Sequence, residues 1–338
     1  MLVTKQKVFR KFWYATVPVS SLEDGPQPFT LLGEKLALFL DADGRPGCLQ
    51  DRCLHRTAKL SKGWIKNGRL VCWYHGWEYD RDGKLACIPQ FPPDQPIPDC
   101  AVQSYRAQER YGYVWVALEE PLQPIPEFDQ DGAPGWRRIH QFYDTWNTSS
   151  LRLMENSFDN SHIAFVHKSS FGDITQPKPE KYEVTETDWG FEAETIVTVV
   201  NPPNSERITG TTDKYTKRHM RNCWFMPFTR RLDIQYPSGL RHVILNCATP
   251  IDDGSIKVVQ VLFRNDDEAS CPAQELIDWD SAIITEDKDV LESTSPDAIV
   301  DVSRKIEMHM PSDRPGMIIR RRLLDLMKAH GEIEVPAA

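Results

Sequence analysis

Four side chains that commonly bind metals stand in two short clusters near the start of the chain. Cys53 and His55 form the first cluster and Cys72 and His75 form the second, which gives the pattern C-x-H, sixteen residues, C-x-x-H. Two thiolates can hold one iron of a [2Fe–2S] centre while two neutral imidazoles hold the other and raise its reduction potential above that of an all-cysteine cluster. A centre of this kind accepts an electron and passes it on.

Zinc is the main alternative for two cysteines and two histidines. Zinc fingers take CxxC from one segment and HxxxH from another, whereas each loop of this sequence contributes one cysteine and one histidine. A set that binds no metal is the other alternative. Strand-like runs around Arg69 and Asp82-Gly83 place the two pairs on the loops of adjacent β-hairpins, which favours the iron–sulfur interpretation.

A second group of candidate ligands consists of Asp159, His162 and His167, with the spacing D-x-x-H-x-x-x-x-H. Two histidines and a carboxylate are the ligands of a non-haem Fe(II) site that keeps open positions. On an ideal helix the two imidazoles would point about 140° apart, so both reach one metal only if the helix breaks or is deformed, for example by a π-bulge. Two histidines on a polar helix surface are the alternative for this motif taken alone.

A further carboxylate is expected from an acidic helix predicted over residues 273–294. Its apolar stripe consists of Leu276, Ile283, Val290 and Leu291. Asp280 and Asp287 lie near the centre of that stripe, where a carboxylate is costly to desolvate unless it is paired or bound to a metal. A narrower inner face would leave Asp287 in solvent and make Asp280 the next candidate.

The segments CLHR and CWYHGW resemble the two ligand loops of the Rieske domain found in ring-hydroxylating and demethylating oxygenases. The D-x-x-H-x-x-x-x-H motif and the tail EMHMPSDRPGMIIRRRLLDL are similar to the corresponding segments of homotrimeric Rieske monooxygenases. The chain thus resembles the terminal oxygenase (alpha) component of the Rieske non-haem iron oxygenases, in the demethylase and hydroxylase branch. One departure is Thr57, where the family more often carries glycine or alanine after the arginine.

The resemblance implies a role for each candidate. The [2Fe–2S] cluster would be bound by Cys53, His55, Cys72 and His75. The mononuclear Fe(II) would be bound by His162, His167 and Asp287, because TEDKDVLE resembles the segment that supplies the third ligand. Asp159 would link the iron to a cluster histidine of the neighbouring subunit, which corresponds to His75; a carboxylate bonded to imidazoles orients the rings and couples the two metals.

The elements that must position these residues predict an α+β protein. Short β-type runs favour an N-terminal all-β Rieske domain over residues 1–120, followed by a Pro-, Gly- and Asp-rich linker over 121–136. Longer strand-like segments and the acidic helix then predict a catalytic domain over 137–338. By resemblance this is a helix-grip (START-like) domain with an antiparallel sheet and a long helix.

Composition narrows the classes of partner. The 338 residues are 40% hydrophobic and 26% charged with a net charge of −9, which argues against nucleic acid and anionic membranes. No signal peptide or membrane span is evident, so a cytoplasmic protein is expected. Without a nucleotide-binding loop, electrons must come from another protein, an NAD(P)H-dependent reductase and/or a ferredoxin. Arg320 to Arg322 could dock such a partner, or form a solvated helix face or subunit contact.

The expected activity is that of an O₂-dependent monooxygenase rather than a ring cis-dihydroxylating dioxygenase. It would insert oxygen into a C–H bond of a small aromatic or cyclic substrate, by hydroxylation or oxidative O- or N-demethylation. The pocket walls are expected from the strands between about 195 and 265. There Asn222, Trp224, Phe225, Met226 and Phe228 could line a mostly apolar cavity, although core packing explains such residues equally well. A Rieske-type electron carrier without catalytic iron is the alternative, although a carrier needs only about the first 120 residues and no second motif.

Overall fold

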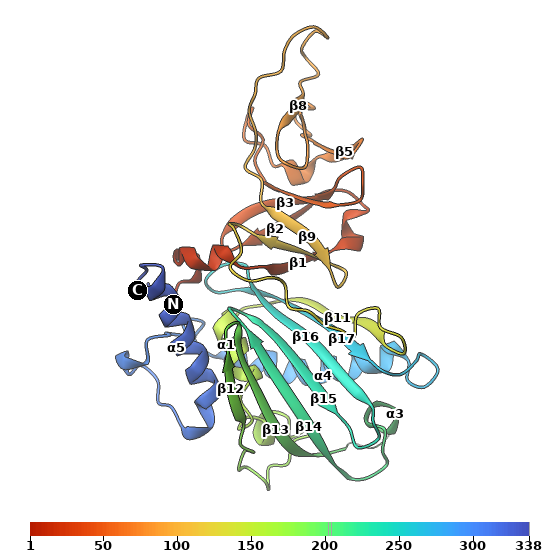
Figure 1. Ribbon diagram of the computed structural model, residues 1–338, viewed down its shortest axis with the longest axis vertical. Coiled ribbons are helices and arrows are strands. Elements are labelled where there is room, and N and C mark those ends of the chain that lie inside the picture. The colour runs from red at the N-terminus through yellow and green to blue at the C-terminus, as the bar shows by residue number, and fades with distance from the viewer. Residues whose placement is uncertain (202, 204, 338) are drawn as a thin grey trace. The chain divides into compact units, whose positions relative to one another are not determined.

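The computed structural model describes residues 1–201, 203 and 205–337, and the chain divides into two compact units (Figure 1). Phe9–Ile125 forms one unit, and Met1–Val8 together with Pro126–Ala338 forms the other. The main division therefore comes between Ile125 and Pro126, and the first eight residues group with the second unit. The predicted domain limits, 1–120 and 137–338, stay a prediction.

The unit Phe9–Ile125 is built from three small antiparallel sheets with the strand orders β1-β10-β9, β2-β3-β4 and β5-β6-β7-β8. Its strands are β1 (Tyr14–Pro18), β2 (Gln27–Leu31), β3 (Glu34–Leu40), β4 (Pro46–Gln50), β5 (Trp64–Lys66), β6 (Arg69–Val71), β7 (Glu78–Tyr79), β8 (Leu85–Cys87), β9 (Arg106–Arg110) and β10 (Tyr113–Ala117). The all-β prediction for this part is confirmed. Phe39, Leu70 and Tyr79 belong to a buried core that also contains Cys53 and Cys72.

The second unit contains a seven-stranded antiparallel sheet with the order β11-β17-β16-β15-β14-β13-β12. The strands are β11 (Arg137–Trp146), β12 (Glu183–Thr187), β13 (Gly190–Val200), β14 (Tyr215–Phe225), β15 (Thr229–Gln235), β16 (Arg241–Pro250) and β17 (Ile256–Arg264). β16 and β17 are runs of β-branched and apolar residues that are buried almost throughout. Such runs suit central strands, which are covered on both faces.

Helices pack against this sheet. They are α1 (Ser150–Ser157), α2 (Ile163–Val166), α3 (Glu206–Thr209), α4 (Ala273–Ser293) and α5 (Arg314–Ala329). The chain also has short 3-10 helices, of which η3 and η4 belong to the first unit. They are η1 (Val3–Lys5), η2 (Lys7–Lys11), η3 (Val19–Leu22), η4 (Leu60–Lys62), η5 (Val302–Arg304) and η6 (Pro311–Asp313). α4 agrees with the helix predicted over 273–294, and Figure 1 shows it crossing one face of the sheet. The predicted α+β class is therefore confirmed. Within the described residues, no helix is long and apolar enough to span a membrane.

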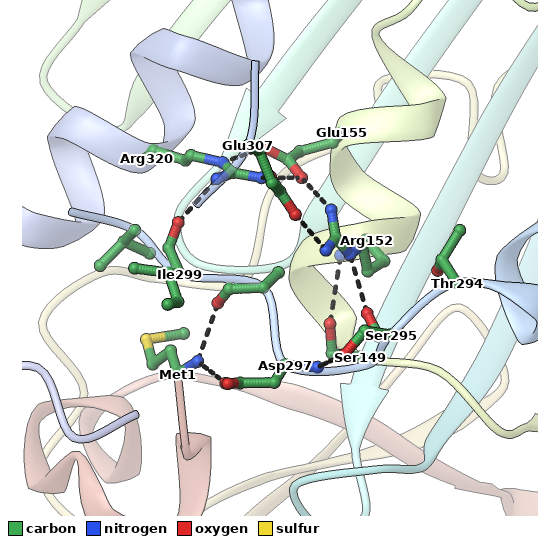
Figure 2. Close-up of polar contacts among 12 residues, drawn as sticks. Met1, Ser149, Arg152, Glu155, Thr294, Ser295, Asp297, Ile299, Glu307 and Arg320 are labelled. Atoms are coloured by element: carbon green, nitrogen blue, oxygen red, sulfur yellow. Dashed lines mark hydrogen bonds and ion pairs between the residues drawn. The ribbon is translucent and has the colours of Figure 1, made fainter. Parts of the chain in front are cut away.

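An arginine network fastens α5 to α1 in the second unit (Figure 2). Arg320 is 3% exposed, and its guanidinium donates to Ile299 O at 2.7 Å, to Glu155 Oε2 at 2.8 Å and to Glu307 Oε2 at 2.6 Å. Arg152 of α1 bonds the same Glu307 from the other side. Because α1 leads directly into the segment that carries the two histidines, this network fixes the start of that segment.

The partner-docking role considered for Arg320 to Arg322 is wrong for Arg320, because its guanidinium is buried and paired with Glu155 and Glu307. The two following arginines are also engaged: Arg321 bonds Glu186, and Arg322 donates to Thr187 O at 2.9 Å and Asp188 O at 3.0 Å. Arg320 and Arg322 therefore hold α5 in place, whereas Arg321 forms an exposed ion pair. Neither a solvated helix face nor a surface for an acidic partner describes Arg320.

Arg320→Met is expected to lower the free energy of unfolding by about 2 to 3 kcal/mol, because two partly buried carboxylates, Glu155 and Glu307, then keep only Arg152 as a charge partner. The matched change Arg321→Met removes an arginine that is 52% exposed and should cost no more than about 0.5 kcal/mol. Chemical denaturation followed by tryptophan fluorescence measures both. Equal losses in the two variants would contradict the role assigned to the network.

Candidate metal centres

The two cysteine–histidine loops of the first unit share one backbone design. Cys53 N donates to Ala58 O at 2.8 Å and Thr57 N donates to Cys53 O at 3.0 Å. Around Cys72 the pattern repeats, with Cys72 N bonded to Trp77 O at 2.8 Å and Gly76 N bonded to Cys72 O at 2.9 Å. The loops follow β4 and β6, so the sheets hold two equivalent turns, each presenting one cysteine and one histidine.

The repeated turn requires a left-handed residue four positions after each cysteine. Gly76 has φ 73° there, and Thr57 has φ 57°. Glycine takes this conformation freely, whereas a β-branched residue is strained in it. The departure from the family pattern at Thr57 therefore leaves the loop shape unchanged, and the threonine is held in a conformation that glycine would adopt at lower cost.

The cysteines and histidines of these loops differ in exposure. Cys53 and Cys72 are 2% and 1% exposed, whereas His55 is exposed and His75 half-buried. Nδ1 of His55 lies 3.1 Å from Nδ1 of His75, so the two rings present the same nitrogen to one point. Tyr79 Oη lies 3.2 Å from Cys53 Sγ. This arrangement fits a cluster with one iron buried on thiolates and the other near the surface on imidazoles.

Two histidines of the second unit flank a single helical turn. His162 precedes α2, His167 follows it, and α1 has already ended at Ser157. The helix therefore breaks instead of carrying the π-bulge considered from the sequence. After His167 the chain turns back on Gly172, whose N–H bonds His167 O at 2.8 Å; a Cβ there would lie 2.1 Å from Ile163 O. Only glycine fits this turn.

Three donor atoms converge between α2 and α4. His162 Nε2 lies 3.1 Å from His167 Nε2, and Asp287 Oδ1 lies 3.5 Å and 3.4 Å from these two nitrogens. A point equidistant from the three atoms in their plane would be about 1.9 Å from each, just inside the usual metal–ligand distance of about 2.0 to 2.2 Å. A metal ion slightly above that plane would contact all three, so the residues fit a facial site.

Two more carboxylates support the histidines from behind. His167 Nδ1 lies 2.9 Å from Glu286 Oε2, which also accepts from Ser170 Oγ at 2.8 Å, and His162 Nδ1 lies 3.4 Å from Asp159 Oδ2. A ring whose Nδ1–H points at a carboxylate keeps a lone pair on Nε2 for a metal. Burial lowers the pKa of His167, but Asp287 and Glu286 raise it above its ordinary value. The two carboxylates around His167 therefore stabilise a positive charge at this site.

Comparisons with known proteins agree with both centres. Residues 12–106 match the Rieske [2Fe-2S] domain, and residues 146–329 match the Vanillate O-demethylase oxygenase C-terminal domain. The chain belongs to the Rieske oxygenases. Methylxanthine N1-demethylase NdmA of Pseudomonas putida is 30% identical over 97% of this chain and 92% of its own length. Its structure matches with a TM-score of 0.81 at 28% identity, over 97% of this chain and 93% of the other.

Two other proteins extend the comparison. Methylxanthine N3-demethylase NdmB of Pseudomonas putida is 27% identical over 87% of this chain and 84% of its own length. The structure of dicamba monooxygenase bound to dicamba shares the fold, with a TM-score of 0.81 at 23% identity over 96% and 98% of the two chains. The predicted monooxygenase with a [2Fe–2S] cluster and a mononuclear iron, acting with O₂ on a small molecule, is confirmed in preference to the electron carrier.

A cavity of about 160 Å³ in the catalytic unit of this Rieske oxygenase opens beside the three donor atoms. Its walls come from α1, α2, α4 and strands β13 to β17, so it lies between the helices and the sheet. Asp280, the second carboxylate considered from the sequence, lines this cavity and is not one of the three converging ligands. Burial raises the pKa of Asp280 to about 6, and its Oδ2 accepts from Gln141 Nε2 at 2.5 Å.

The residues predicted to line the pocket are not those that line this cavity. Strand β14 contributes Arg218 and Met220, whereas Asn222 and Trp224 lie on the same face farther along the strand. Asn222 accepts from Arg230 Nε at 2.9 Å and so supports a cavity residue from outside. Sequence reasoning also missed the position of Glu286; its place next to Asp287 on the acidic helix was the available signal.

Gly76→Ala is expected to speed the loss of the cluster's visible absorption, because alanine at φ 73° costs about 1 to 2 kcal/mol and its Cβ would lie 3.2 Å from Pro89 Cγ. Gly44→Ala is the control, since Gly44 has φ 74° in the same unit with open space around it. The control should lose similar stability yet keep its absorption as long as the parent protein. Equal cluster loss in both would contradict the role of the loop.

Proposed function

We propose that this Rieske oxygenase inserts one oxygen atom of O₂ into a C–H bond of a small cyclic substrate bound in the cavity beside the triad. The observation that carries the proposal is the convergence of His162 Nε2, His167 Nε2 and Asp287 Oδ1 at the wall of that cavity. Hydroxylation and oxidative O- or N-demethylation both begin with this C–H attack. Two relatives named as methylxanthine demethylases support the second outcome.

In this proposal the ligands are divided between two centres. Cys53, His55, Cys72 and His75 hold the [2Fe–2S] cluster, and His162, His167 and Asp287 hold the mononuclear iron. When bound, these groups supply single electrons and O₂ activation. The chain's own residues orient the ligands and shape the cavity.

The protein residues around the iron act through proton positions and ring orientation. Glu286 accepts the Nδ1 proton of His167 and fixes the face that this ring turns to the metal. Asp159 is itself held by the backbone N–H groups of Ser161, at 2.6 Å, and His162, at 3.2 Å. Burial raises the pKa of Asp159, but the hydrogen bond and charge of His162, with the bonds from Ser161, lower it below its ordinary value. Asp159 therefore stands as a carboxylate beside the His162 ring.

The electrons would come from an NAD(P)H-dependent reductase and/or a ferredoxin, in the cytoplasm. We further propose a homotrimer in which Asp159 meets His75 of the partner subunit, so that a carboxylate links the two centres. Trp73 and Tyr74, 56% and 58% exposed, lie directly before His75. Exposed aromatic side chains at this position suit a surface that a neighbouring subunit covers.

The division of metals is tested by alanine variants. His162→Ala, His167→Ala or Asp287→Ala should keep the visible spectrum of the cluster and lose the mononuclear iron, because only the facial site loses a donor. Cys53→Ala or His75→Ala should instead lose the cluster spectrum. Iron and sulfide analysis with EPR after reduction measures both, against about three irons and two sulfides per chain in the parent protein. Loss of the cluster spectrum in the His162, His167 or Asp287 variants would contradict this division of the ligands between the two centres.

Asp159→Asn is expected to keep both metals and to lower turnover by about 10- to 100-fold or more, because the amide cannot accept from two imidazoles as a carboxylate does. The readout is the rate at which reduced cluster is reoxidised on adding O₂ and substrate. The control is Asp188→Asn, on the turn between β12 and β13. Unchanged reoxidation in Asp159→Asn would remove the linking role and leave the ligand assignment intact.

Glu286→Gln should weaken iron binding by about 10- to 100-fold, because the His167 ring loses the carboxylate that fixes its tautomer and orientation. Asp289→Asn removes an exposed charge from the same helix and serves as the control. Titration of iron-depleted protein with Fe(II) gives both dissociation constants. If the two variants bind iron equally, Glu286 does not position His167.

A further inference from the structure

Arg218 is the cavity residue whose chemistry remains unexplained. It lies on β14 beside Met220, lines the cavity of the metal triad and is 6% exposed. A guanidinium stays charged at all accessible pH values, so its position places a permanent positive charge inside a buried cavity. Burying such a charge is costly unless something compensates it.

In the described part of the chain, the carboxylate of Asp280 and two aromatic rings compensate this charge only partly. Nε and Nη2 of Arg218 are buried and have no hydrogen-bond partner. These two nitrogens form the edge of the guanidinium that holds a carboxylate through two parallel hydrogen bonds. Other buried arginines of the same unit are satisfied: Arg264 is bound to Asp266 at 2.6 Å, and Arg320 is bound to two glutamates.

Asp280 interacts with Arg218 through its charge, but neither Nε nor Nη2 of Arg218 donates a hydrogen bond to it. Its Oδ2 accepts from Gln141 Nε2, Gln141 Oε1 accepts from Gln260 Nε2 at 3.0 Å, and Gln260 Oε1 accepts from Asn246 Nδ2 at 3.0 Å. This chain of amides runs in one direction and ends on the carboxylate. His242 is a neutral ring, because burial and the charges of Arg264 and Arg218 lower its pKa well below the ordinary value.

Aromatic rings hold the guanidinium near the metal triad. Its Cζ lies 5.2 Å from the ring centre of Tyr236 and 5.6 Å from that of Phe171, whose ring stacks at 4.8 Å on His167. Arg218 is therefore at most about 10 Å from the ring of a triad histidine, with one aromatic side chain between them. A molecule bound to its free edge would extend toward the triad through the same cavity.

The volume of the cavity restricts the size of that molecule. A cavity of about 150 Å³ accommodates one benzene ring, and this cavity measures about 160 Å³. The apolar part of its walls includes Leu153, Val197, Leu232, Ile244, Trp279 and Ile283. The space thus suits one ring with an anionic group at one end.

We propose that Arg218 binds the carboxylate of a single-ring organic acid and holds its opposite end toward the metal triad. This inference rests on the proposed function, because it names the substrate class of the same cavity. It rests on Arg218 and not on the relatives: two are named as methylxanthine demethylases, and the matched domain of the second unit is named after vanillate O-demethylase. Arg218 is then the residue that sets charge specificity and the position that is oxidised.

The test is calorimetric titration of the iron-loaded holoprotein with benzoate, para-methoxybenzoate and the matching neutral amides. The parent protein should bind at least one acid in the millimolar range or better, and at least about tenfold more tightly than its amide. Arg218→Met should lose that preference while still binding the amide. Arg218→Lys, which keeps the charge without the two-pronged edge, should retain part of it.

Lys217→Gln is the matched control, because Lys217 is exposed on the opposite face of the same strand. It should bind both ligands as the parent protein does. Failure of every acid to bind, equal affinity for acid and amide, or an acid preference that persists in Arg218→Met would overturn the proposal; the last result would place the acid on another cation of the cavity, either Arg230 or the iron. The preference of the parent protein decides the question even if a variant does not fold.

Iron, sulfide and EPR measurements on the same samples separate this inference from the proposed function. A full set of metals without acid preference would refute the role of Arg218 and leave the ligand assignment standing. Acid preference without mononuclear iron would refute the ligand assignment instead.

Discussion

Three donor atoms have to meet at one point although they come from separate parts of the chain. His162 and His167 flank a single turn, whereas Asp287 lies on a long helix that follows the whole sheet. α4 must therefore pass beside α2, and Figure 1 shows α4 crossing the sheet. The buried strands β16 and β17, the break between α1 and α2, and the arginine network that fixes α1 all serve this one requirement (Figure 2).

The same constraint concentrates negative charge in a half-buried space. Asp159, Glu286 and Asp287 surround two imidazoles, and such a group of carboxylates is favourable only where positive charge balances it. A metal ion supplies that charge at the centre. Glu286 bonds Nδ1 of His167, and Asp159 lies 3.4 Å from Nδ1 of His162, so carboxylates lie behind both rings while each ring turns Nε2 to the metal site.

The cavity beside the triad also contains buried polar and charged groups, and these differ in whether the protein pairs them. Between the helices and the sheet, Arg264 is paired and Asp280 is bound by a chain of amides, so these buried groups are satisfied by the protein. The buried edge of Arg218 is satisfied by nothing in the described residues. A protein interior seldom leaves a charge in this state, and a binding site has a physical reason to do so because its ligand completes the pairing.

The sequence by itself determined the metal chemistry, because ligand type and local spacing identify the cysteine–histidine loops and the paired histidines without knowledge of the fold. It also determined the long helix, and the apolar stripe singled out Asp280 and Asp287, between which the family resemblance chose Asp287. Only the tertiary structure decided that Glu286 supports His167, that Arg320 is buried, and that Arg218 lines the cavity while Asn222 and Trp224 lie beyond it. Those outcomes depend on strand register and on contacts between distant segments, which local periodicity does not encode.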